Sequence, residues 1–382
     1  MTPRYPAATD RMPDADALRA IFDGTTHFTV GLEEEAMLVD GETFDLIPRA
    51  PEVLERSGGD PRFKLELPAT QLEIVLPPTA TVAESAAALA AARRDLAAAT
   101  RGIGALVATG VHPFAAPLGQ VNDTERHQAI AREYGPIARA QQVGALQVHV
   151  AVPGQERALA VYNALRSFLP EVAALAANAP FFSGSDSGLA SVRPKISELL
   201  PRQGVPPKID SWDDYAAALR WGATVDELPA TARWWWELRP HPAHGTLELR
   251  VPDAQATVED AAAVAAFAQS LVVWLAERHD AGELDPPDPT WRIEENRWQA
   301  CRHGLDARIS HLREGTVTPA RELLRERVET LLPHARAIGC EPELAAVRRL
   351  LAANGAERQR AEGDALGAAR MLAAAYEPAA EG

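Results

Sequence analysis

Four segments that lie far apart in the chain alternate apolar with polar or charged residues at a period of two. Successive side chains of a β-strand point to opposite faces, so each segment would have one apolar and one polar face. The pattern covers residues 28–40, 63–76 with a break at Pro68, 146–152 and 246–251. It predicts an antiparallel sheet that packs one face on a hydrophobic core and keeps the other face polar.

The polar faces of these segments carry mostly carboxylates. Besides Thr29, Lys64, Gln71 and Thr246, their polar members are Glu33, Glu35, Glu66, Glu73, Gln147, His149, Glu248 and Arg250. A solvated sheet face explains any one segment alone, but such a face usually mixes Thr, Lys and Arg with Glu. If the glutamates converge, neighbouring carboxylates repel by on the order of several kcal/mol in a medium of reduced dielectric. The set therefore predicts a positive group between them.

Oxygen ligands with little imidazole and no sulfur favour Mg²⁺ or Mn²⁺ over zinc. Magnesium held by carboxylates usually keeps waters and bridges phosphates, which indicates a nucleotide such as ATP. The chain has neither a G-x-x-x-x-G-K-[ST] loop nor a G-x-G-x-x-G turn between strand and helix. Arginines would then hold the phosphates, because the guanidinium fork matches their oxygens. The candidates are Arg193, Arg239 and Arg250.

Long helical patterns accompany the strands, which places the chain in the α+β class. Thr81-Val-Ala-Glu84 is a capping box in front of an Ala-rich helix that ends near Arg101. Further helices are predicted over 125–140, 155–177 and 257–277, and beyond Asp288 the chain is mostly helical. We expect a loose segment over residues 1–25, a main domain over 26–304, and a helical C-terminal extension over 305–382 that packs on it.

The charge balance limits the partners. The chain has 53 acidic and 38 basic residues and a net charge of -15, which argues against nucleic acid or an anionic membrane as main partner. The first twenty residues lack the apolar stretch of a secretory signal, and the apolar run 261–276 is too short to span a bilayer. Two cysteines, Cys301 and Cys340, favour a reducing compartment and the cytoplasm.

Nine short motifs occur in order between about Val30 and Gly304. They are Gly31-Leu-Glu-Glu-Glu35, Glu66 with Gln71-Leu-Glu73, Gly110-Val-His112-Pro113-Phe114, Gln147-Val-His149-Val, Asn178-Ala-Pro180-Phe181, Ser191-Val-Arg193, Trp235-Trp-Glu-Leu-Arg239-Pro240, Glu248-Leu-Arg250-Val-Pro-Asp253, and Glu295-Asn296-Arg297-Trp298 with Arg302-His-Gly304. Any one of these motifs is weak evidence for a family, but so many of them in one order is strong evidence. Through them the chain resembles the bacterial carboxylate-amine ligases of the glutamate-cysteine ligase type 2 family, which are related in fold to glutamine synthetase.

The resemblance implies an antiparallel sheet curved into an active-site funnel, with helices on its outer face. Mg²⁺-ATP would enter from one side and the amino-acid substrates from the other. Carried over by motif, the metal ligands would be Glu33, Glu35, Glu66, Glu73 and Glu248. Arg250, with Arg193 and Arg239, would neutralise the transferring phosphoryl group, and Gln147 and His149 are assigned to cofactor binding.

The implied reaction joins a small-molecule carboxylate to an amine through an acyl phosphate, with glutamate and cysteine as the implied pair and a homodimer as the implied assembly. Two departures affect this expectation. Gln147 stands where the family usually has histidine, and Ala179 stands where it has serine. Two alternatives stay open: a family member that binds nucleotide or amino acid without catalysis, and a metal-dependent amidohydrolase, although the latter favours more histidine ligands.

Several single residues allow two interpretations. His112 is either a buried turn residue or a substrate contact, and Asp186 and Ser191 belong either to a substrate gate or to a plain turn. Glu34 points away from Glu33 and Glu35, which favours a structural or surface role. Trp234, Trp235 and Trp236 are typical of core and rim positions, with stacking on adenine as the alternative.

Overall fold

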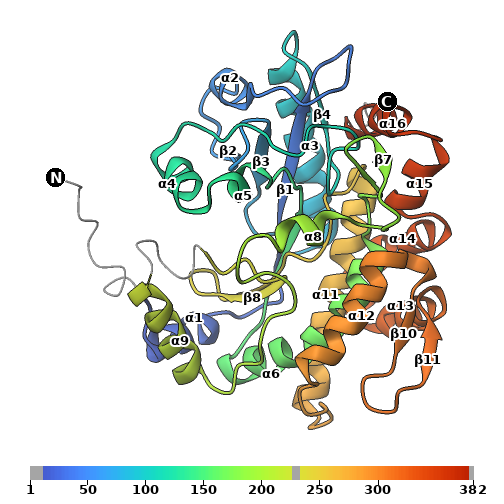
Figure 1. The fold of residues 1–382 in the computed structure, drawn as a ribbon. Coiled ribbons are helices and arrows are strands. Elements are labelled where there is room, and N and C mark those ends of the chain that lie inside the picture. Colours follow the sequence, from blue (N-terminus) through green and yellow to red (C-terminus); the bar gives the residue numbers. More distant parts are fainter. Residues whose placement is uncertain (1–11, 226–232, 378–382) are drawn as a thin grey trace.

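A computed structural model describes residues 12–225 and 233–377 (Figure 1). Its main sheet has seven strands in the order β2-β3-β1-β5-β9-β8, with β4 paired to the C-terminal end of β1. Every strand pair in it is antiparallel, which confirms the predicted mixture of helices with an antiparallel sheet. The strands are β1 (Val30–Val39), β2 (Phe63–Leu65), β3 (Gln71–Val75), β4 (Ala105–Val107), β5 (Leu146–Ala151), β8 (Leu238–His241) and β9 (Thr246–Leu249).

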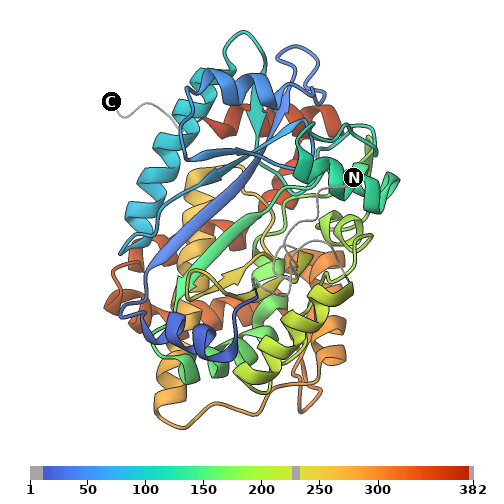
Figure 2. The same cartoon turned by 90° about the vertical axis from the view of Figure 1, so that its left-hand side faces the viewer.

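The sheet is open and is not strongly curled, so the expected funnel curvature is not confirmed (Figure 2). Its edge strands β2 and β8 have no sheet partner on their outer sides among the described strands. Segments outside the sheet instead cover the polar face. These are α4 (Glu125–Tyr134), α5 (Pro136–Arg139) and α8 (Arg193–Ser197). Residues of α4 and α8, and Gln141 just after α5, line a cavity together with Glu35 and Gln71 of the sheet.

The apolar face of the sheet packs on two long helices, α3 (Val82–Thr100) and α11 (Val258–Asp280). The predicted capping box of α3 is present, with Thr81 and Glu84 bonded reciprocally to the backbone. Helix α11 has 23 residues, so the expectation that this apolar run is too short for a bilayer is wrong. Its length and composition alone would allow a membrane span, but 89% of its most apolar window is buried inside the protein, as in the core helix of a soluble fold.

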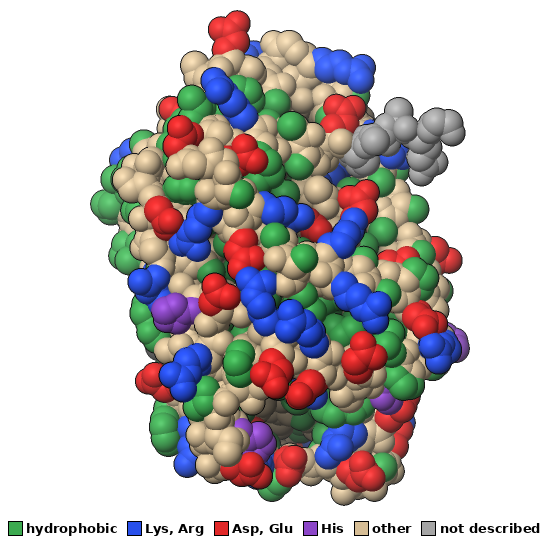
Figure 3. Space-filling view, turned by 90° about the vertical axis from the view of Figure 1, so that its right-hand side faces the viewer, with side chains coloured by type: hydrophobic (Ala, Val, Ile, Leu, Met, Phe, Trp, Pro, Cys, Tyr) green, Lys and Arg blue, Asp and Glu red, His purple; other side chains and the backbone are tan. Residues whose placement is uncertain are grey.

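The chain ends in four helices that pack around this core: α13 (Ala320–Ala337), α14 (Glu341–Ala352), α15 (Gly355–Ala361) and α16 (Ala365–Tyr376). Helices α13 and α14 contact α11, and α16 contacts β4. On the face that these helices help to form, acidic and basic side chains are interspersed without a large patch of one sign (Figure 3).

A buried ion pair ties the sheet to the C-terminal helix. Glu34 points to the apolar side of β1, where Arg93 of α3 donates to its carboxylate over 2.8 and 2.5 Å, and both side chains are fully buried. Arg93 also donates to the backbone oxygen of Tyr376 over 3.2 Å and lies over its ring. Glu34 is therefore a structural residue, as its position in the strand predicts.

The N-terminal segment is more ordered than the sequence predicts. Within the expected loose stretch 1–25, Ala15–Asp23 forms helix α1, capped by the Asp14 side chain on the Ala17 N–H over 2.8 Å. Leu18 and Phe22 lie four residues apart on one face, and both are fully buried. This pair packs α1 on the core. The helix was not predicted because the segment around it is rich in proline and aspartate.

The remaining elements connect the layers. Of the helices predicted above, 125–140 is divided at Gly135, and 155–177 is divided before Pro170, which lies in the first turn of α7. The other elements are α2 (Ala50–Arg56), α6 (Gln155–Leu165), the 3₁₀ turn η2 (Arg166–Phe168), α7 (Leu169–Leu175), α9 (Trp212–Val225), α12 (Thr290–His303), η3 (Gly304–Asp306), and the hairpins β6 (Phe181–Phe182) with β7 (Ser185–Asp186) and β10 (Arg308–Ser310) with β11 (Val317–Pro319).

Candidate active site

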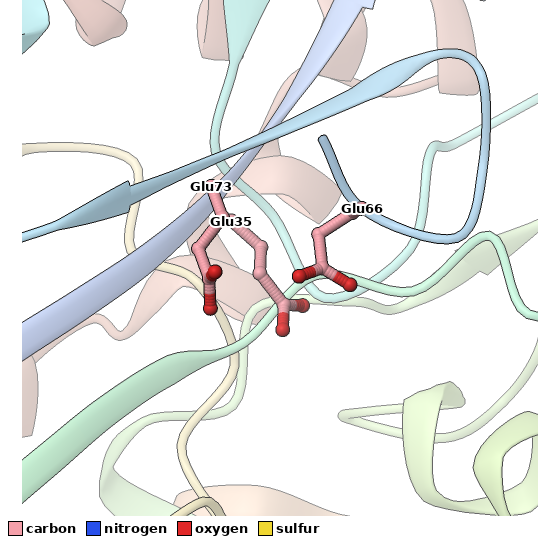
Figure 4. A group of neighbouring side chains, drawn as sticks. All are labelled: Glu35, Glu66 and Glu73. Atoms are coloured by element: carbon pink, nitrogen blue, oxygen red, sulfur yellow. The ribbon is translucent and has the colours of Figure 1, made fainter. Parts of the chain in front are cut away.

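Three of the predicted glutamates converge on the polar face of the sheet. Glu35 of β1 and Glu73 of β3 are register partners on adjacent strands, and Glu66 reaches them from the turn between β2 and β3. Each offers a carboxylate oxygen, and these oxygens lie within 4.8 Å of one another (Figure 4). We call Glu35, Glu66 and Glu73 the carboxylate trio. Its all-oxygen donor set fits a hard divalent cation.

The electrostatics of the trio favour a cation. Burial, reinforced by the charge of Glu66, raises the pKa of Glu35 to about 7. Burial raises the pKa of Glu73 well above its ordinary value, and the neighbouring charges of Glu66, Glu33 and Glu35 add to the effect. The pKa of Glu66 is also raised, mainly by burial. A bound divalent cation would remove this repulsion and favour the ionised carboxylates.

Gln147 connects the trio to the arginines. Its Nε2 donates to Glu35 over 3.1 Å and to Glu73 over 3.4 Å, and its Oε1 accepts from Arg250. An imidazole at this position could not offer a donor pair and an acceptor in the same way as an amide. Gln147 therefore orients both charged groups without a charge of its own.

Glu248 lies apart from the trio. Arg250 donates to it over 2.5 Å, and Arg239 donates to both of its oxygens. Burial alone would raise the pKa of Glu248, but the charges of Arg250 and Arg239 outweigh burial and hold this pKa far below its ordinary value. The structure thus places Glu248 in an ion-pair cluster with the two arginines, while its assignment as a metal ligand stays a prediction.

Glu33 lies between the trio and His149. Its Oε1 is 3.5 Å from Nε2 of His149, whose Nδ1 is 3.0 Å from the Thr246 hydroxyl. Neighbouring carboxylates alone would favour the charged form of His149. Burial outweighs the charges of Glu248 and Glu33, however, and lowers the pKa of His149, so the neutral ring is favoured.

Asp253 holds the third predicted arginine. Arg193 donates to Asp253 over 3.5 Å and to the backbone oxygens of Val251 and Arg250 over 3.2 and 2.7 Å. Asp253 also accepts from the Ser191 hydroxyl over 3.0 Å, so Ser191 positions the site and does not belong to a free turn. The role of Asp253 is not predicted from the sequence, although the residue lies three positions after Arg250 in the same motif.

A cavity of about 130 Å³ opens beside the trio. Glu35, Glu66, Arg193, Arg250 and Trp235 line it, together with Arg126 and Glu237, which were not predicted as site residues. Arg297 holds the Glu237 carboxylate through bonds of 2.6 to 3.0 Å. Glu237 and Arg297 each belong to one of the nine motifs. Arg126 lies on an exposed face of α4, and no motif in the sequence marks it.

The other ambiguous residues are structural. His112 is buried, its Nε2 is 2.8 Å from the Phe44 carbonyl, and its Nδ1 accepts from two backbone N–H groups. Asp186 pairs with Arg360 over 2.8 Å. Trp234 and Trp236 line a separate small cavity beside Tyr215. Cys301 and Cys340 are buried free thiols.

Comparison with known proteins decides the family. The family model described as Glutamate-cysteine ligase family 2 matches residues 29–370. The chain belongs to this family. This membership confirms the resemblance drawn from the motifs and the prediction that the chain is a ligase of the glutamate-cysteine ligase type.

Two Rubrobacter xylanophilus proteins are similar over most of the chain. "Putative glutamate--cysteine ligase 2-3" is 41% identical and covers 89% of this chain and 93% of its own length. "Putative glutamate--cysteine ligase 2-1" is 36% identical and covers 94% of this chain and 97% of its own length.

Two solved structures share the fold. The glutamate–cysteine ligase of Francisella tularensis, in complex with AMP, matches with a TM-score of 0.64 at 12% identity and covers 93% of this chain and 90% of its own. A bifunctional glutathione synthetase of Pasteurella multocida matches with a TM-score of 0.59 at 16% identity and covers 94% of this chain and 53% of its own.

The raised pKa values of the trio predict how stability depends on pH. The folded protein binds more protons at these carboxylates than the unfolded chain does, so in metal-free buffer their contribution to the free energy of unfolding should fall as the pH rises from about 4.5 to about 7. Burial lowers the pKa of His112, His127, His149 and His241, so these side chains contribute in the opposite direction over much of the same window. For Glu35 alone the loss is about 3 kcal/mol. Denaturant titrations of the wild type and Glu35→Gln at several pH values isolate the carboxylate contribution. The wild type should lose free energy of unfolding relative to Glu35→Gln as the pH rises, and Mg²⁺ should restore this loss above pH 7. A difference between the two proteins that stays constant over this window would contradict the account.

Proposed function

We propose that this family member is an ATP-dependent carboxylate-amine ligase that forms an amide bond through an acyl phosphate. The carboxylate trio beside Arg250 is the observation that supports this most strongly, because three carboxylates that could hold a cation lie next to a guanidinium that could bind phosphate. The glutamate–cysteine ligase names of the relatives support glutamate as the acid and cysteine as the amine. A cytoplasmic homodimer remains part of the proposal.

The trio would hold Mg²⁺ or Mn²⁺, with Glu33 and Glu248 as the further predicted ligands. The cation would shield the negative charge of the ATP phosphates and of the incoming carboxylate. In the first step a carboxylate oxygen of the acid attacks the γ-phosphorus, ADP departs, and an acyl phosphate forms. In the second step the amine attacks the acyl carbon, the C–O bond to phosphate breaks, and the amide, inorganic phosphate and a proton result.

The arginines would act on the transferring group. Arg250 borders the cavity and is fixed by Gln147 and Glu248, so its guanidinium is oriented before the phosphoryl group arrives. Arg193 is held by Asp253 in the same wall. Because phosphoryl transfer depends mainly on position and charge, such fixed cations supply what the protein must contribute.

Hydroxylamine provides the test, because it captures an acyl phosphate as a hydroxamate. With glutamate, ATP and Mg²⁺, the protein should release ADP and form a hydroxamate, and cysteine should replace hydroxylamine to give an amide. Pairs of other acids and amines extend the same assay. Tight ATP binding without ADP release across all pairs would favour the non-catalytic alternative, and amide cleavage without ATP would favour the amidohydrolase.

Gln147 should matter for rate more than for substrate binding. In Gln147→Ala, Arg250 loses an acceptor and the trio loses a donor. A hydrogen bond to a charged group contributes about 1.5–3 kcal/mol, so kcat should fall by roughly 10- to 100-fold with a small change in KM. Gln147→Glu keeps the acceptor for Arg250 but adds a negative charge beside Glu35. We expect the fold-decrease in kcat of this variant to exceed the fold-decrease in its Mg²⁺ affinity. Equal kcat for the wild type and Gln147→Ala would show that this link does not orient the site.

A further inference from the structure

A second cavity, of about 390 Å³, shares no lining residue with the cavity of the proposed site. Its walls are the end of α6 and η2, the C-terminal half of α11, the β10–β11 hairpin and α13. The face that carries these elements is hollowed near its lower end (Figure 3). The volume falls within the range of roughly 300–1,000 Å³ that is typical of small-molecule sites.

Aromatic rings form the floor of this cavity. Phe168 and Trp274 meet edge to face, with ring centroids 5.6 Å apart at an angle of 86°. The guanidinium of Arg327 lies 4.8 and 5.0 Å from the two centroids and is held by Glu171 over 2.9 and 3.0 Å. Buried Leu275 and Ile309 extend the apolar surface.

The charges around this floor compensate one another. Arg327 pairs with Glu171, and Arg313 lies 3.3 Å from Asp288. Arg278 lies 3.6 Å from Glu283, just outside the wall. The three arginines of the wall are matched in number by three lining carboxylates, Glu171, Asp285 and Asp288, so the cavity offers no excess charge to a phosphate or a free carboxylate. The lining therefore fits an uncharged ligand with a flat ring.

The cavity is already formed, because hydrogen bonds fix its walls. Asn296 of α12 donates to the backbone oxygen of Ser310 over 2.7 Å and accepts from its N–H over 2.9 Å. The Ser167 hydroxyl donates to Asp288 over 2.8 Å, which fixes the loop before α12 to η2. A ligand would therefore bind without ordering these segments first.

Helix α12 links this cavity to the proposed active site. Asn296 lines the second cavity, and the next residue, Arg297, holds Glu237 in the wall of the first. Asn296 is hydrogen-bonded to Ser310 of the β10–β11 hairpin, so a ligand that displaces the hairpin would also shift α12. Arg297 would then carry this shift to Glu237. We propose that the second cavity binds a small uncharged aromatic compound and that α12 transmits its occupancy to the active site.

Indole is a suitable probe, with indole-3-acetate as its charged counterpart. Titration followed by ligand-observed NMR should show saturable binding of indole to the full chain and at least tenfold weaker binding of indole-3-acetate. Leu323→Trp should fill the cavity and weaken indole binding at least tenfold, whereas Glu326→Trp, on an exposed position of the same helix, should not. Absent binding, or equal binding to both variants, would overturn the site.

The link through α12 has its own readout. Saturating indole should change the Kd of Mg²⁺-ATP by at least about fivefold in the wild type and leave Leu323→Trp unchanged, since couplings between sites typically span 5- to 150-fold. This part rests on the proposed function, so Mg²⁺-ATP binding without indole is measured first, and its absence would count against that function alone. Indole binding with an unaltered Kd of Mg²⁺-ATP would overturn the link.

Discussion

Replacing Glu73 by glutamine should lower the rate of ADP formation by at least about 10³-fold, because the trio would lose a charge that holds the cation against the phosphates. Glutamine keeps the shape of glutamate and can form similar hydrogen bonds, so the fold should persist. Burial and the neighbouring like charges raise the pKa of Glu73, so the variant should be at least as stable as the wild type in metal-free buffer. Coupled measurement of ADP release and thermal unfolding checks both expectations.

A matched control separates this effect from a general loss of acidic charge. Glu55 is exposed on α2, away from the trio, and Glu55→Gln should leave turnover and stability unchanged. Turnover in Glu73→Gln close to that of Glu55→Gln would contradict the role of the trio. A variant that unfolds would instead show that Glu73 stabilises the sheet despite its buried charge.

Breaking the buried Glu34–Arg93 pair should cause the largest loss of stability outside the active site. Arg93→Ala leaves Glu34 fully buried without its partner and removes three hydrogen bonds to the backbone oxygens of Gln255, Ala256 and Tyr376. Removing one partner of a buried pair typically costs about 3–5 kcal/mol. Urea unfolding measures the loss, and the exchange of backbone amides in α16 should increase most.

The adjacent residue provides the control. Arg94 on the same helix is only half-buried, so Arg94→Ala should change the free energy of unfolding by less than about 1 kcal/mol. Replacing both partners with apolar residues, as in Glu34→Leu with Arg93→Met, should recover much of the loss, because the unpaired charge is gone. A single Arg93→Ala variant as stable as the Arg94→Ala control would show that this pair does not fasten the C-terminal helix.

The sequence predicts the sheet and much of the site because a strand fixes the direction of its side chains. Parity alone places Glu33 and Glu35 on one face and Glu34 on the other, and the structure has all three there. The register between β1 and β3 brings Glu35 opposite Glu73. The alternating patterns of the two strands allow this pairing, but they do not specify it. The metal-binding roles themselves remain predictions.

Other features depend on contacts between distant parts of the chain. The partners of Glu248 come from β8 and from the residue after β9, so its pairing with Arg239 and Arg250 depends on which strands become neighbours. Arg93 follows a long run of alanines, and nothing in the sequence around it indicates that Glu34 is its buried partner. The helix α1 is concealed by the Pro- and Asp-rich composition around it, and the sheet curvature implied by the resemblance requires knowledge of how edge strands pair.

The central claim is that Glu35, Glu66 and Glu73 together bind a divalent cation for the ATP phosphates. Titration of the metal-free protein with Mn²⁺, followed by electron paramagnetic resonance with and without a non-hydrolysable ATP analogue, tests it most directly. We predict saturable Mn²⁺ binding that tightens with the analogue, weakens as the pH falls below about 7, and is lost in Glu66→Gln but kept in Glu55→Gln. Mn²⁺ binding that is equal in the wild type and Glu66→Gln would contradict the claim.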